Sequence, residues 1–459
     1  MKYFFLLLFP TLALSASATT WNVGAAQVYT MPSQVSTLVQ NGDTVNIDAG
    51  IYALDVAKWT AHDLVLRGVG GIAQLPSGGL VYGGKAIWVI AGDNALVENI
   101  AFSEATCVDQ NGAGIRQEGH HLTVRNCKFM GNQMGILAGD LSPSHILIEN
   151  SEFANNGAGD GFSHNVYINH VDTLTFRYNY SHGAWVGHDL KSRAHVNFIL
   201  YNRISDEQGE ASRCIDLPNG GITYLVGNAI EQGPNSPNQD VIGYGLEGLS
   251  NPTPHELYAV NNTLVSNRSN AIYFHLAPPM TFFKAYNNIL AGPASDPYSG
   301  LPTAIDTASN VFLSTTAAFH FADASNYNYQ LTENSTLVLN NAMDPGFANG
   351  FSLSATLQYV HPTSMQPRCV PGTPDIGAFE WCEPGLGVEM SNPEFAFFPN
   401  PTSRFVYFKA PVRRLTIVNA AGNVEFERNN VSSLDLVNFQ SGIYFLTTSN
   451  GTYPVMLFR

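Results

Sequence analysis

Charged side chains are scarce in this sequence, and most of them are acidic. They make up 12% of the 459 residues, with 36 Asp and Glu against 21 Lys and Arg, so the formal net charge is −15. Globular domains usually carry about a quarter charged residues. A chain with this balance has no general electrostatic attraction for nucleic acid. It would also repel an acidic polysaccharide, so binding one would require a local basic patch.

Long apolar runs are missing too, apart from one at the N-terminus. Residues 1–18 have the features of a secretory signal peptide, with an early lysine, an apolar run over 4–14 and small residues at 16–18. The run is too short to span a membrane comfortably, and no later stretch reaches the necessary length. No cysteine follows it, so a lipoprotein anchor is not indicated. We therefore expect a protein that leaves the cytoplasm and has no transmembrane segment.

Cysteines are few, and export permits disulfides. The five are Cys107, Cys127, Cys214, Cys369 and Cys382. Cys369 and Cys382 flank a short Pro/Gly-rich segment and could pair, as could Cys107 and Cys127 in neighbouring segments. Cys214 is then predicted to be a buried, unreactive thiol. The sequence has no phosphate loop, no Cys/His zinc spacing and no serine nucleophile elbow.

What the chain does contain is a repeat, which begins near residue 90. Each copy is a short apolar strand, an asparagine and a second short strand, as in LTVRNCKF, ILIENSEF and YAVNNTLV. Fixed spacing of this kind indicates a solenoid, and units of this length are too short for a βαβ crossover. We therefore predict a parallel β-helix in which the asparagines line up along one edge. They are Asn99, Asn126, Asn150, Asn179, Asn202, Asn228, Asn262 and Asn288. Before the repeat, residues 32–40 are predicted to form a short helix, capped by Ser33, that covers the open end of the stack.

The chemically richest part of the repeat lies in three segments, GDGFSHNVYI, VGHDLKSRA and SRCIDLPNGG. Alternation along a strand places Val166, Leu190 and Ile215 inside, so the residue after each of them faces outward. These outward residues are Tyr167, Lys191 and Asp216, predicted to be in register on consecutive turns. Parallel columns are Asn165, Asp189 and Cys214 on one side, and Asn169, Arg193 and Pro218 on the other.

These repeats and segments resemble the pectin-lyase-like superfamily of right-handed parallel β-helices, over about residues 22–380. The central block also resembles a group of bacterial β-helix repeat proteins. The superfamily includes pectin and alginate lyases, polygalacturonases, epimerases and phage tailspikes, so the resemblance implies a fold and leaves the substrate open. On this resemblance we expect the β-helix domain to span residues 19–381.

The C-terminal part has a different pattern. PDIGAFEW (374–381) resembles a segment that closes such β-helices, and 382–397 has the composition of a linker. Residues 398–459 resemble the C-terminal sorting domain of type IX secretion, on FPNP, SGIY and the final strand, and are expected to form a small β-sandwich. The resemblance implies the secretion machinery as a partner and the cell surface or the medium as the destination.

The function we favour is action on an extracellular polysaccharide, by lyase chemistry if the sugar is a uronic acid. Such a lyase needs a base, a cation for the carboxylate and an acid for the leaving oxygen. Lys191 could be the base, although carboxylates beside it would favour its ammonium form. The full set of catalytic candidates is Lys191, Arg193, Asp216, His188 and Tyr167, and the substrate-binding candidates are Arg213, His164, Asn165 and Asp189.

Two other functions remain open. A glycoside hydrolase could use Asp189 and Asp216 as its two carboxyl groups. Alternatively, the face is a non-catalytic glycan-binding or adhesive surface held by Lys191–Asp216 and Arg193–Asp189 salt bridges. No metal site is predicted, but Asp206, Glu207 and Glu210 could bind Ca²⁺ if they are not simply a solvated loop. We expect a monomer.

Overall fold

The computed structural model describes most of the chain as two compact units, Met1–Trp381 and Cys382–Arg459. The described residues are 18–293, 296–369, 372–382 and, within 397–457, all except 399–401, 403, 420–423, 441 and 449–450. Nearly all of the predicted signal peptide and linker, and parts of the FPNP and SGIY motifs, therefore lie outside the described residues. No helix among the described residues is long and apolar enough to cross a membrane.

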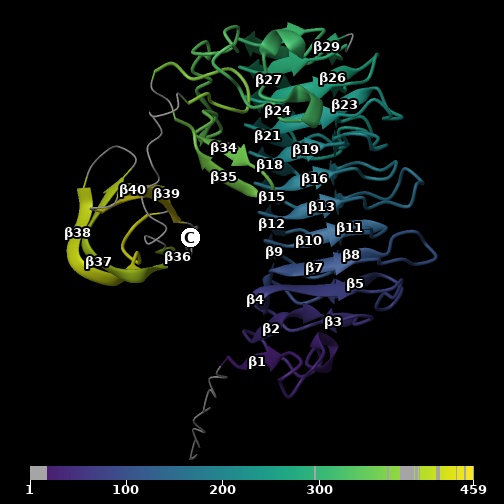
Figure 1. The fold of residues 1–459 in the computed structure, drawn as a ribbon, viewed down its shortest axis with the longest axis vertical. Helices are drawn as coiled ribbons and strands as arrows, with labels where there is room; N and C mark the ends of the chain where they lie inside the picture. Colours follow the sequence, from purple (N-terminus) through teal and green to yellow (C-terminus); the bar gives the residue numbers. More distant parts are fainter. Residues whose placement is uncertain are drawn as a thin grey trace, which may run out of the picture. The chain divides into compact units, whose positions relative to one another are not determined.

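The first unit is a stack of parallel strands, which confirms the predicted parallel β-helix (Figure 1). One wall is a ten-stranded sheet. Its strands are β3 (Ala57–Trp59), β5 (Ala86–Ile90), β8 (Ala113–Gln117), β11 (Met134–Ala138), β14 (Val166–Ile168), β17 (Leu190–Ser192), β20 (Ile215–Leu217), β23 (Asp240–Tyr244), β26 (Ile272–Leu276) and β29 (Asp296–Ser299).

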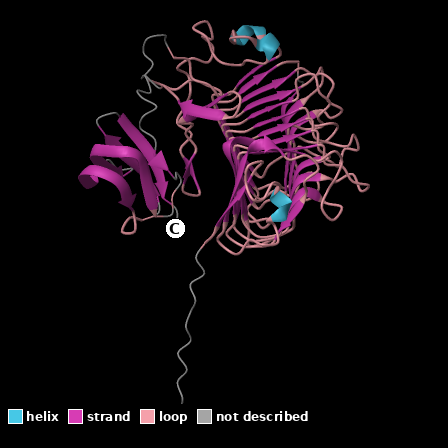
Figure 2. Cartoon of the chain, turned by 60° about the horizontal axis from the view of Figure 1, so that its bottom comes forward, coloured by secondary structure: helices cyan, strands magenta, loops and turns pink. Residues whose placement is uncertain are grey.

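The other two walls form one 21-stranded sheet that bends at a corner. The strands before the corner are β1 (Thr20–Val23), β2 (Thr44–Ile51), β4 (Val65–Pro76), β6 (Ala95–Glu98), β9 (Leu122–Arg125), β12 (His145–Glu149), β15 (Thr173–Arg177), β18 (Val196–Leu200), β21 (Ile222–Val226), β24 (Glu256–Val260), β27 (Phe282–Tyr286) and β30 (Ala304–Ala308). The strands after it are β7 (Ile100–Ser103), β10 (Lys128–Met130), β13 (Glu152–Ala154), β16 (Tyr180–His182), β19 (Arg203–Ser205), β22 (Ala229–Gln232), β25 (Thr263–Ser266), β28 (Ile289–Ala291) and β31 (Val311–Leu313). Figure 2 shows these strands as layers, with the loops along their edges.

Each turn pairs in register with the next, so equivalent side chains stack inside the coil. Phe102, Phe129 and Phe153 lie on consecutive turns, with ring centroids 5.0 and 4.8 Å apart. All three are fully buried. Burial of an aromatic side chain contributes roughly 2–3 kcal/mol through its apolar area. The alternation of the short strands thus produces a continuous apolar core.

The eight asparagines predicted to share one edge occupy two adjacent positions at the corner. Asn99, Asn126 and Asn150 have positive φ angles of 58°, 50° and 52°. The β12–β15 register pairs Glu149 with Arg177, so Asn150 is equivalent to Tyr178 and not to the Asn179 we had aligned with it. The prediction was therefore wrong by one residue between the first three asparagines and the last five.

The later asparagines form a buried ladder inside the coil. Each side-chain amide donates to the carboxamide oxygen of the next turn, at 3.2 Å for Asn179–Asn202, 2.9 Å for Asn202–Asn228 and 3.0 Å for Asn228–Asn262. The same oxygen accepts from the backbone N–H of the preceding asparagine, as from Asn202 to Asn228 at 2.9 Å. The ladder continues through Asn288 to Asn310. It satisfies backbone groups that the sharp corner would otherwise leave buried and unpaired.

Two local predictions differ from the structure. The helix expected over 32–40 is only the 3₁₀ turn η1 (Pro32–Gln34), and Ser33 does not cap it; the Gln34 carboxamide accepts from the backbone N–H groups of Thr30 and Met31. Three β-branched or small residues follow, which favour a helix weakly. Cys107 and Cys127 are free thiols, whereas Cys369 and Cys382 are disulfide-bonded.

A segment after the last turn runs back along the outside of the coil. It contains η2 (Ala317–Phe319), η3 (Ala324–Asn326) and the hairpins β32 (Phe347–Ala348) with β33 (Phe351–Ser352) and β34 (Leu357–Val360) with β35 (Ser364–Pro367). The segment 374–381 lies against the side of the coil, where Ala378 N–H donates to Thr263 Oγ1 at 3.0 Å. A buried ion pair between Arg368 and Glu380, at 2.9 Å, holds it.

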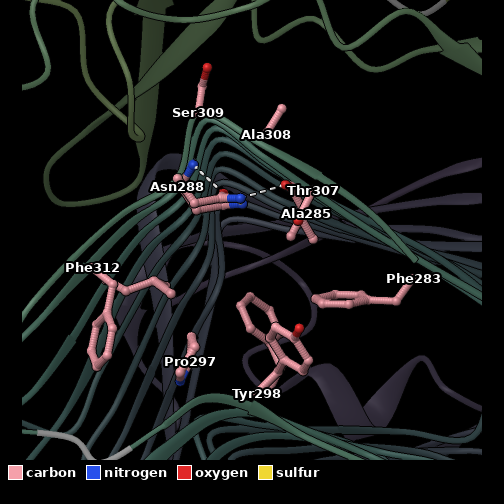
Figure 3. A pocket seen from close by; sticks show the side chains of 12 residues that line it. Phe283, Ala285, Asn288, Pro297, Tyr298, Thr307, Ala308, Ser309 and Phe312 are labelled. Carbon is pink, nitrogen blue, oxygen red and sulfur yellow. Dashed lines mark hydrogen bonds between the residues drawn. The ribbon is translucent and has the colours of Figure 1, made fainter. Parts of the chain in front are cut away.

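At the C-terminal end of the coil the apolar interior leaves a cavity of 300 Å³. Figure 3 shows that Phe283, Tyr298 and Phe312 border it, below the corner that carries Asn288. It is lined by the last turns only, so it is separate from the charged residues of β14, β17 and β20.

The second unit is small and all-β, as predicted, and its described strands form one antiparallel sheet. They are β36 (Phe397–Phe398), β37 (Phe405–Asn419), β38 (Val424–Asp435), β39 (Gly442–Thr448) and β40 (Gly451–Leu457). The pairing of β37 with β38 shifts register between Tyr407 and Val412. Such irregularities bend long strands, which lets one sheet enclose its own core of Val406, Leu415, Ile417 and their neighbours.

The ladder gives a stability prediction. Asn228→Ala removes the acceptor of Asn202 N–H and the donor to Ile199 O, all of them buried. We expect a loss of at least about 3 kcal/mol, because each buried group left unpaired costs about 1–3 kcal/mol. Asn126→Gly is the matched control, since glycine readily adopts positive φ; it should change stability by less than about 1 kcal/mol. The free energy of unfolding is measured by chemical denaturation. Equal losses of it in the two variants would contradict the distinction between the buried ladder position and the exposed corner position.

Candidate functional site

The outward residues of three consecutive strands form one column, as the alternation predicts. Tyr167 on β14 pairs with Lys191 on β17, which pairs with Asp216 on β20. The preceding residues, Val166, Leu190 and Ile215, are fully buried in the core. A shift of one residue would expose these apolar side chains and bury the charged ones. The predicted register is therefore confirmed.

The centre of the column is an ion-pair network that also includes Glu247, which the sequence analysis missed. Lys191 Nζ lies 2.7 Å from Glu247 Oε1 and 3.4 Å from Asp216 Oδ2. Arg193 Nη2 lies 2.5 Å from Glu247 Oε2, so two cations hold the two oxygens of one carboxylate. The Glu247 side chain is 46% exposed, whereas that of Lys191 is 10% exposed. Glu247 is therefore the solvent-facing part of the network.

The turn that carries Glu247 is fixed to the coil. Gly245 N–H donates to Leu217 O at 2.8 Å, and Glu247 N–H donates to Pro218 O at 3.0 Å. Gly245 has φ 75°, a conformation that glycine adopts without strain. The backbone position of Glu247 is thus set by β20, while its side chain remains accessible.

Tyr167 is held by the same arginine. Arg193 Nε donates to Tyr167 Oη at 2.9 Å, and Arg193 Nη1 donates to Asn219 Oδ1 at 2.5 Å. Lys191 Nζ lies 5.7 Å from the centre of the Tyr167 ring, within the range of a cation–π contact. The phenol oxygen accepts from the guanidinium, so its own proton is available to an incoming group.

A second arginine lies on the other side of Asp216. Arg213 Nη1 donates to Asp216 Oδ1 at 3.2 Å, and Arg213 Nη2 donates to Asp240 Oδ2 at 3.0 Å. Gly243 is the next residue in the outward column, and a Cβ there would lie 3.0 Å from both Arg213 Nε and Asp216 Oδ1. The missing side chain at Gly243 therefore leaves the space in which this arginine lies.

His164 and His188 stack beside the column, with ring centroids 4.8 Å apart. The backbone N–H of His188 donates to His164 Nδ1 at 2.9 Å, and the backbone N–H of Arg213 donates to His188 Nδ1 at 3.2 Å. Burial, followed by the positive charge of Lys191, lowers the pKa of His164 to about 3. Burial and the neighbouring His164 lower the pKa of His188 well below its usual value. Both rings are therefore neutral, and His188 Nε2 lies 3.6 Å from Asp216 Oδ2.

The two carboxyl groups that contact Lys191 have opposite pKa shifts. Burial raises the pKa of Asp216, although Arg213 and Lys191 oppose that effect. Burial also acts on Glu247, but hydrogen bonds from Lys191 and Arg193 outweigh it and lower the pKa of Glu247. Glu247 is the one of the two that faces solvent, and its two cationic partners favour its ionised form.

Asn165 and Asp189, predicted to bind substrate, lie inside the coil. Asn165 Nδ2 donates to Asp189 Oδ1 at 3.0 Å, and Asn165 Oδ1 accepts from Asn156 N–H at 3.1 Å. Both side chains are fully buried, because they precede the inward-facing Val166 and Leu190 at a bend where the simple alternation ends. The prediction of substrate binding by these two residues was therefore wrong. The proposed Arg193–Asp189 salt bridge is replaced by Arg193–Glu247, and Asp189 and Asp216 cannot act together on one substrate.

Asp189 belongs to a buried acidic group together with Asp206 and Glu231. Burial, with the nearby charge of Asp206, raises the pKa of Asp189 well above its usual value. Burial likewise raises the pKa of Asp206 to about 6 and that of Glu231 to about 7. Cys214 beside them is buried, as predicted, and burial raises the pKa of its thiol.

The three residues considered for Ca²⁺ lie near one another, since burial and then the charges of Glu210 and Glu207 raise the pKa of Asp206. Asp206 Oδ1 accepts from Ala211 N–H at 2.9 Å, Glu207 Oε1 pairs with Arg203 at 2.9 Å, and Glu210 is exposed. Among the described residues, no group of three or more His, Cys, Asp or Glu side chains is arranged to hold a metal ion. Calcium binding by the acidic run therefore stays a prediction.

Comparison with known proteins identifies the C-terminal unit. Residues 396–456 match the model of the secretion system C-terminal sorting domain. The chain is therefore a parallel β-helix protein with a type IX sorting domain, exported to the cell surface or secreted. The signal peptide predicted over 1–18 agrees with this destination.

Solved structures similar to the β-helix include two at low sequence identity. Pectate lyase Pel9A is 12% identical, with a TM-score of 0.46 over 80% of this chain and 97% of that one. The deglycosylated pectin methylesterase from Aspergillus niger is 11% identical, with a TM-score of 0.29 over 66% of this chain and 89% of that one. At this distance they give no argument about activity. No curated protein matches the sequence.

The buried acidic group predicts how stability depends on pH. A carboxyl whose pKa is raised on folding stabilises the protein at low pH, and this contribution is lost as the pH rises through the folded-state value. Because Asp206 titrates at about 6 and Glu231 at about 7, the melting temperature of the coil should fall between pH 5 and pH 8. Asp189→Asn keeps the shape without the charge, so it should reduce this decline.

The matched control is Asp109→Asn, because Asp109 is exposed. It should leave the pH profile of the melting temperature unchanged. A wild-type melting temperature that rises from pH 5 to pH 8 would show that the interior carboxyl groups do not carry the protons we assign to them.

Proposed function

We propose that the outward cluster around Tyr167, Lys191 and Arg193 binds a carboxylate-bearing polysaccharide and cleaves it by β-elimination. The observation that carries the proposal is the pair of ion pairs to the Glu247 carboxylate. Lys191 Nζ lies 2.7 Å from Oε1, and Arg193 Nη2 lies 2.5 Å from Oε2. Cations already arranged around one accessible carboxylate suit the carboxylate of a uronic acid. Both cations are paired with carboxylates, so an acidic polymer gains this attraction only where its own carboxylate takes the place of Glu247.

In this proposal the sugar carboxylate replaces the Glu247 side chain. The exchange keeps the number of ion pairs constant, so its cost is small compared with opening a buried salt bridge. Arg193 then neutralises the uronate carboxylate, which makes the adjacent C5 proton more acidic. Arg213, held by Asp216 and Asp240, supports the cluster from the side.

The reaction then needs a base and an acid. Lys191 lies beside the bound carboxylate and hence beside C5, and it acts as the base in its free-amine form, after its ammonium group has released one proton to solvent. It accepts the C5 proton, the C4–O bond breaks with its electron pair on oxygen, and Tyr167 donates a proton to that oxygen. The products are an unsaturated sugar and a free hydroxyl. Asp216 and the neutral His188 keep Lys191 in place.

Lys191→Ala tests this role. Removal of a catalytic base typically costs 10²–10⁴-fold, so we expect at least about 100-fold lower turnover of a polyuronate. The assay follows the absorbance of unsaturated products beside reducing ends, with polygalacturonate, alginate and a glycosaminoglycan. Lys128→Ala is the matched control, since Lys128 also pairs with a glutamate, at 2.8 Å, on another wall of the coil. A wild-type protein that gives no unsaturated product on any polyuronate would rule out the lyase.

A retaining glycoside hydrolase is the second candidate, with Asp216 and Glu247 in place of the pair that the structure excludes. Both carboxyl groups contact Lys191 Nζ, which fits the separation of about 5–5.5 Å that such enzymes need. Their pKa values are shifted apart, with the buried Asp216 as the proton donor and Glu247 as the ionised nucleophile. This enzyme would release reducing ends without unsaturated sugars.

Glu247→Gln separates the two candidates. In the lyase, Glu247 competes with the substrate carboxylate, so the variant should show a KM for the polyuronate several-fold lower, with kcat preserved. In the hydrolase, Glu247 is the nucleophile, and kcat should fall by at least about 1000-fold. Initial rates over a range of polymer concentrations distinguish the outcomes, and Glu118→Gln, at an exposed ion pair with Lys58, serves as the control.

A further inference from the structure

Two exposed aromatic side chains lie on the loops that lead into the cluster. Phe162 is 80% exposed and lies just before β14, and Trp185 is 55% exposed and lies just before β17. Between each of them and its strand comes one of the stacked histidines, His164 and His188. From Trp185 to Lys191 the chain spans six residues, so their Cα atoms lie within about 22 Å of each other.

Single exposed aromatics are common, but Trp185 has a supporting surface made of glycine backbone. A Cβ on Gly159 would lie 2.9 Å from Cε2 and Cζ2 of the indole ring. A Cβ on Gly157 would lie 2.6 Å from the backbone oxygen of Trp185 and 3.0 Å from its Cβ. The φ angles are 140° at Gly157 and 73° at Gly159, which side-chain-bearing residues adopt only with strain. The indole is therefore packed on backbone on one side, while more than half of the residue stays in contact with water.

The two loops are also fixed to each other and to the coil. The backbone N–H of Trp185 donates to Asn156 O at 2.9 Å, and the backbone N–H of Gly157 donates to Asn132 O at 2.9 Å. Asp160 Oδ1 accepts from the backbone N–H groups of Phe162 and Ser163, both at 2.9 Å. A ring held in this way loses little conformational freedom on binding, which is what makes a rigid aromatic side chain an efficient contact.

We propose that Trp185 is a stacking subsite for a sugar ring of the same polysaccharide whose carboxylate binds at Lys191 and Arg193. This inference rests on the proposed function, because it takes its ligand from the neighbouring cluster. A sugar presents an apolar C–H face and polar edges, which suits a flat exposed ring. The subsite adds affinity for longer chains and takes no part in bond cleavage.

The test compares chain lengths in the full-length protein. Trp185→Ala should raise KM for polygalacturonate or alginate polymer by at least about 10-fold and leave kcat unchanged. It should have less than a 2-fold effect on the shortest oligosaccharide that is cleaved. Trp185→Phe keeps a flat ring and should recover most of the loss, which also guards against a folding defect in the alanine variant. The matched control is Phe347→Ala, because Phe347 is 77% exposed on the segment outside the coil.

Tryptophan fluorescence gives a readout that does not depend on cleavage. Trp59 and Trp88 are buried and Trp21 and Trp381 are partly exposed, so the contribution of Trp185 is the difference in acrylamide quenching between the wild type and Trp185→Phe. Polymer should protect the wild type from quenching and should not protect Trp185→Phe to the same extent. Cleavage with an unchanged KM in Trp185→Ala would overturn the subsite and leave the lyase intact.

The converse outcomes are also distinct. Protection by a neutral glycan such as xylan, without cleavage of any polyuronate, would retain the subsite and reject the proposed function. Protection that rises with protein concentration in the absence of glycan would mean that a second copy of the chain covers the ring, which overturns the inference. No protection by any glycan would overturn it as well.

Discussion

Backbone hydrogen bonding between parallel, in-register turns is the constraint on which the rest of this structure depends. Because each turn pairs residue by residue with the next, side chains at equivalent positions must stack, and alternation divides them between the core and the outer face. The core gains its phenylalanine stack in this way, and the outer face gains Tyr167, Lys191 and Asp216 in one column. The chemistry of the cluster is therefore a product of the same register that produces stability.

The contrast between Asp189 and Asp216 shows how strongly one residue position decides the state of a carboxyl group. Asp216 faces outward, where Lys191 and Arg213 contact it. Asp189 faces the interior, where its carboxamide neighbour Asn165 is uncharged and the nearest charged groups are other acids. The first can take part in an ion-pair network, whereas the second is a neutral member of the polar interior.

The sequence was sufficient for what depends on periodicity. The parallel coil, the inward Val166, Leu190 and Ile215, and the outward column all follow from alternation and repeat length. It was insufficient where the chain bends, since alternation does not extend through a corner, and so Asn165 and the later asparagines were misplaced. Glu247 and Asp240 were missed because they lie on and just after β23, beyond the three segments that the alternation aligned.

The asparagine ladder has a consequence for the evolution of chain length. From Asn202 onward each turn receives the same bonds from the turn before and gives the same bonds to the turn after. The segment between two successive ladder asparagines is thus an interchangeable module, whose removal or duplication joins ends that already match chemically. The lineage could lengthen or shorten the coil in whole turns while the three turns that hold Tyr167, Lys191 and Asp216 stayed intact.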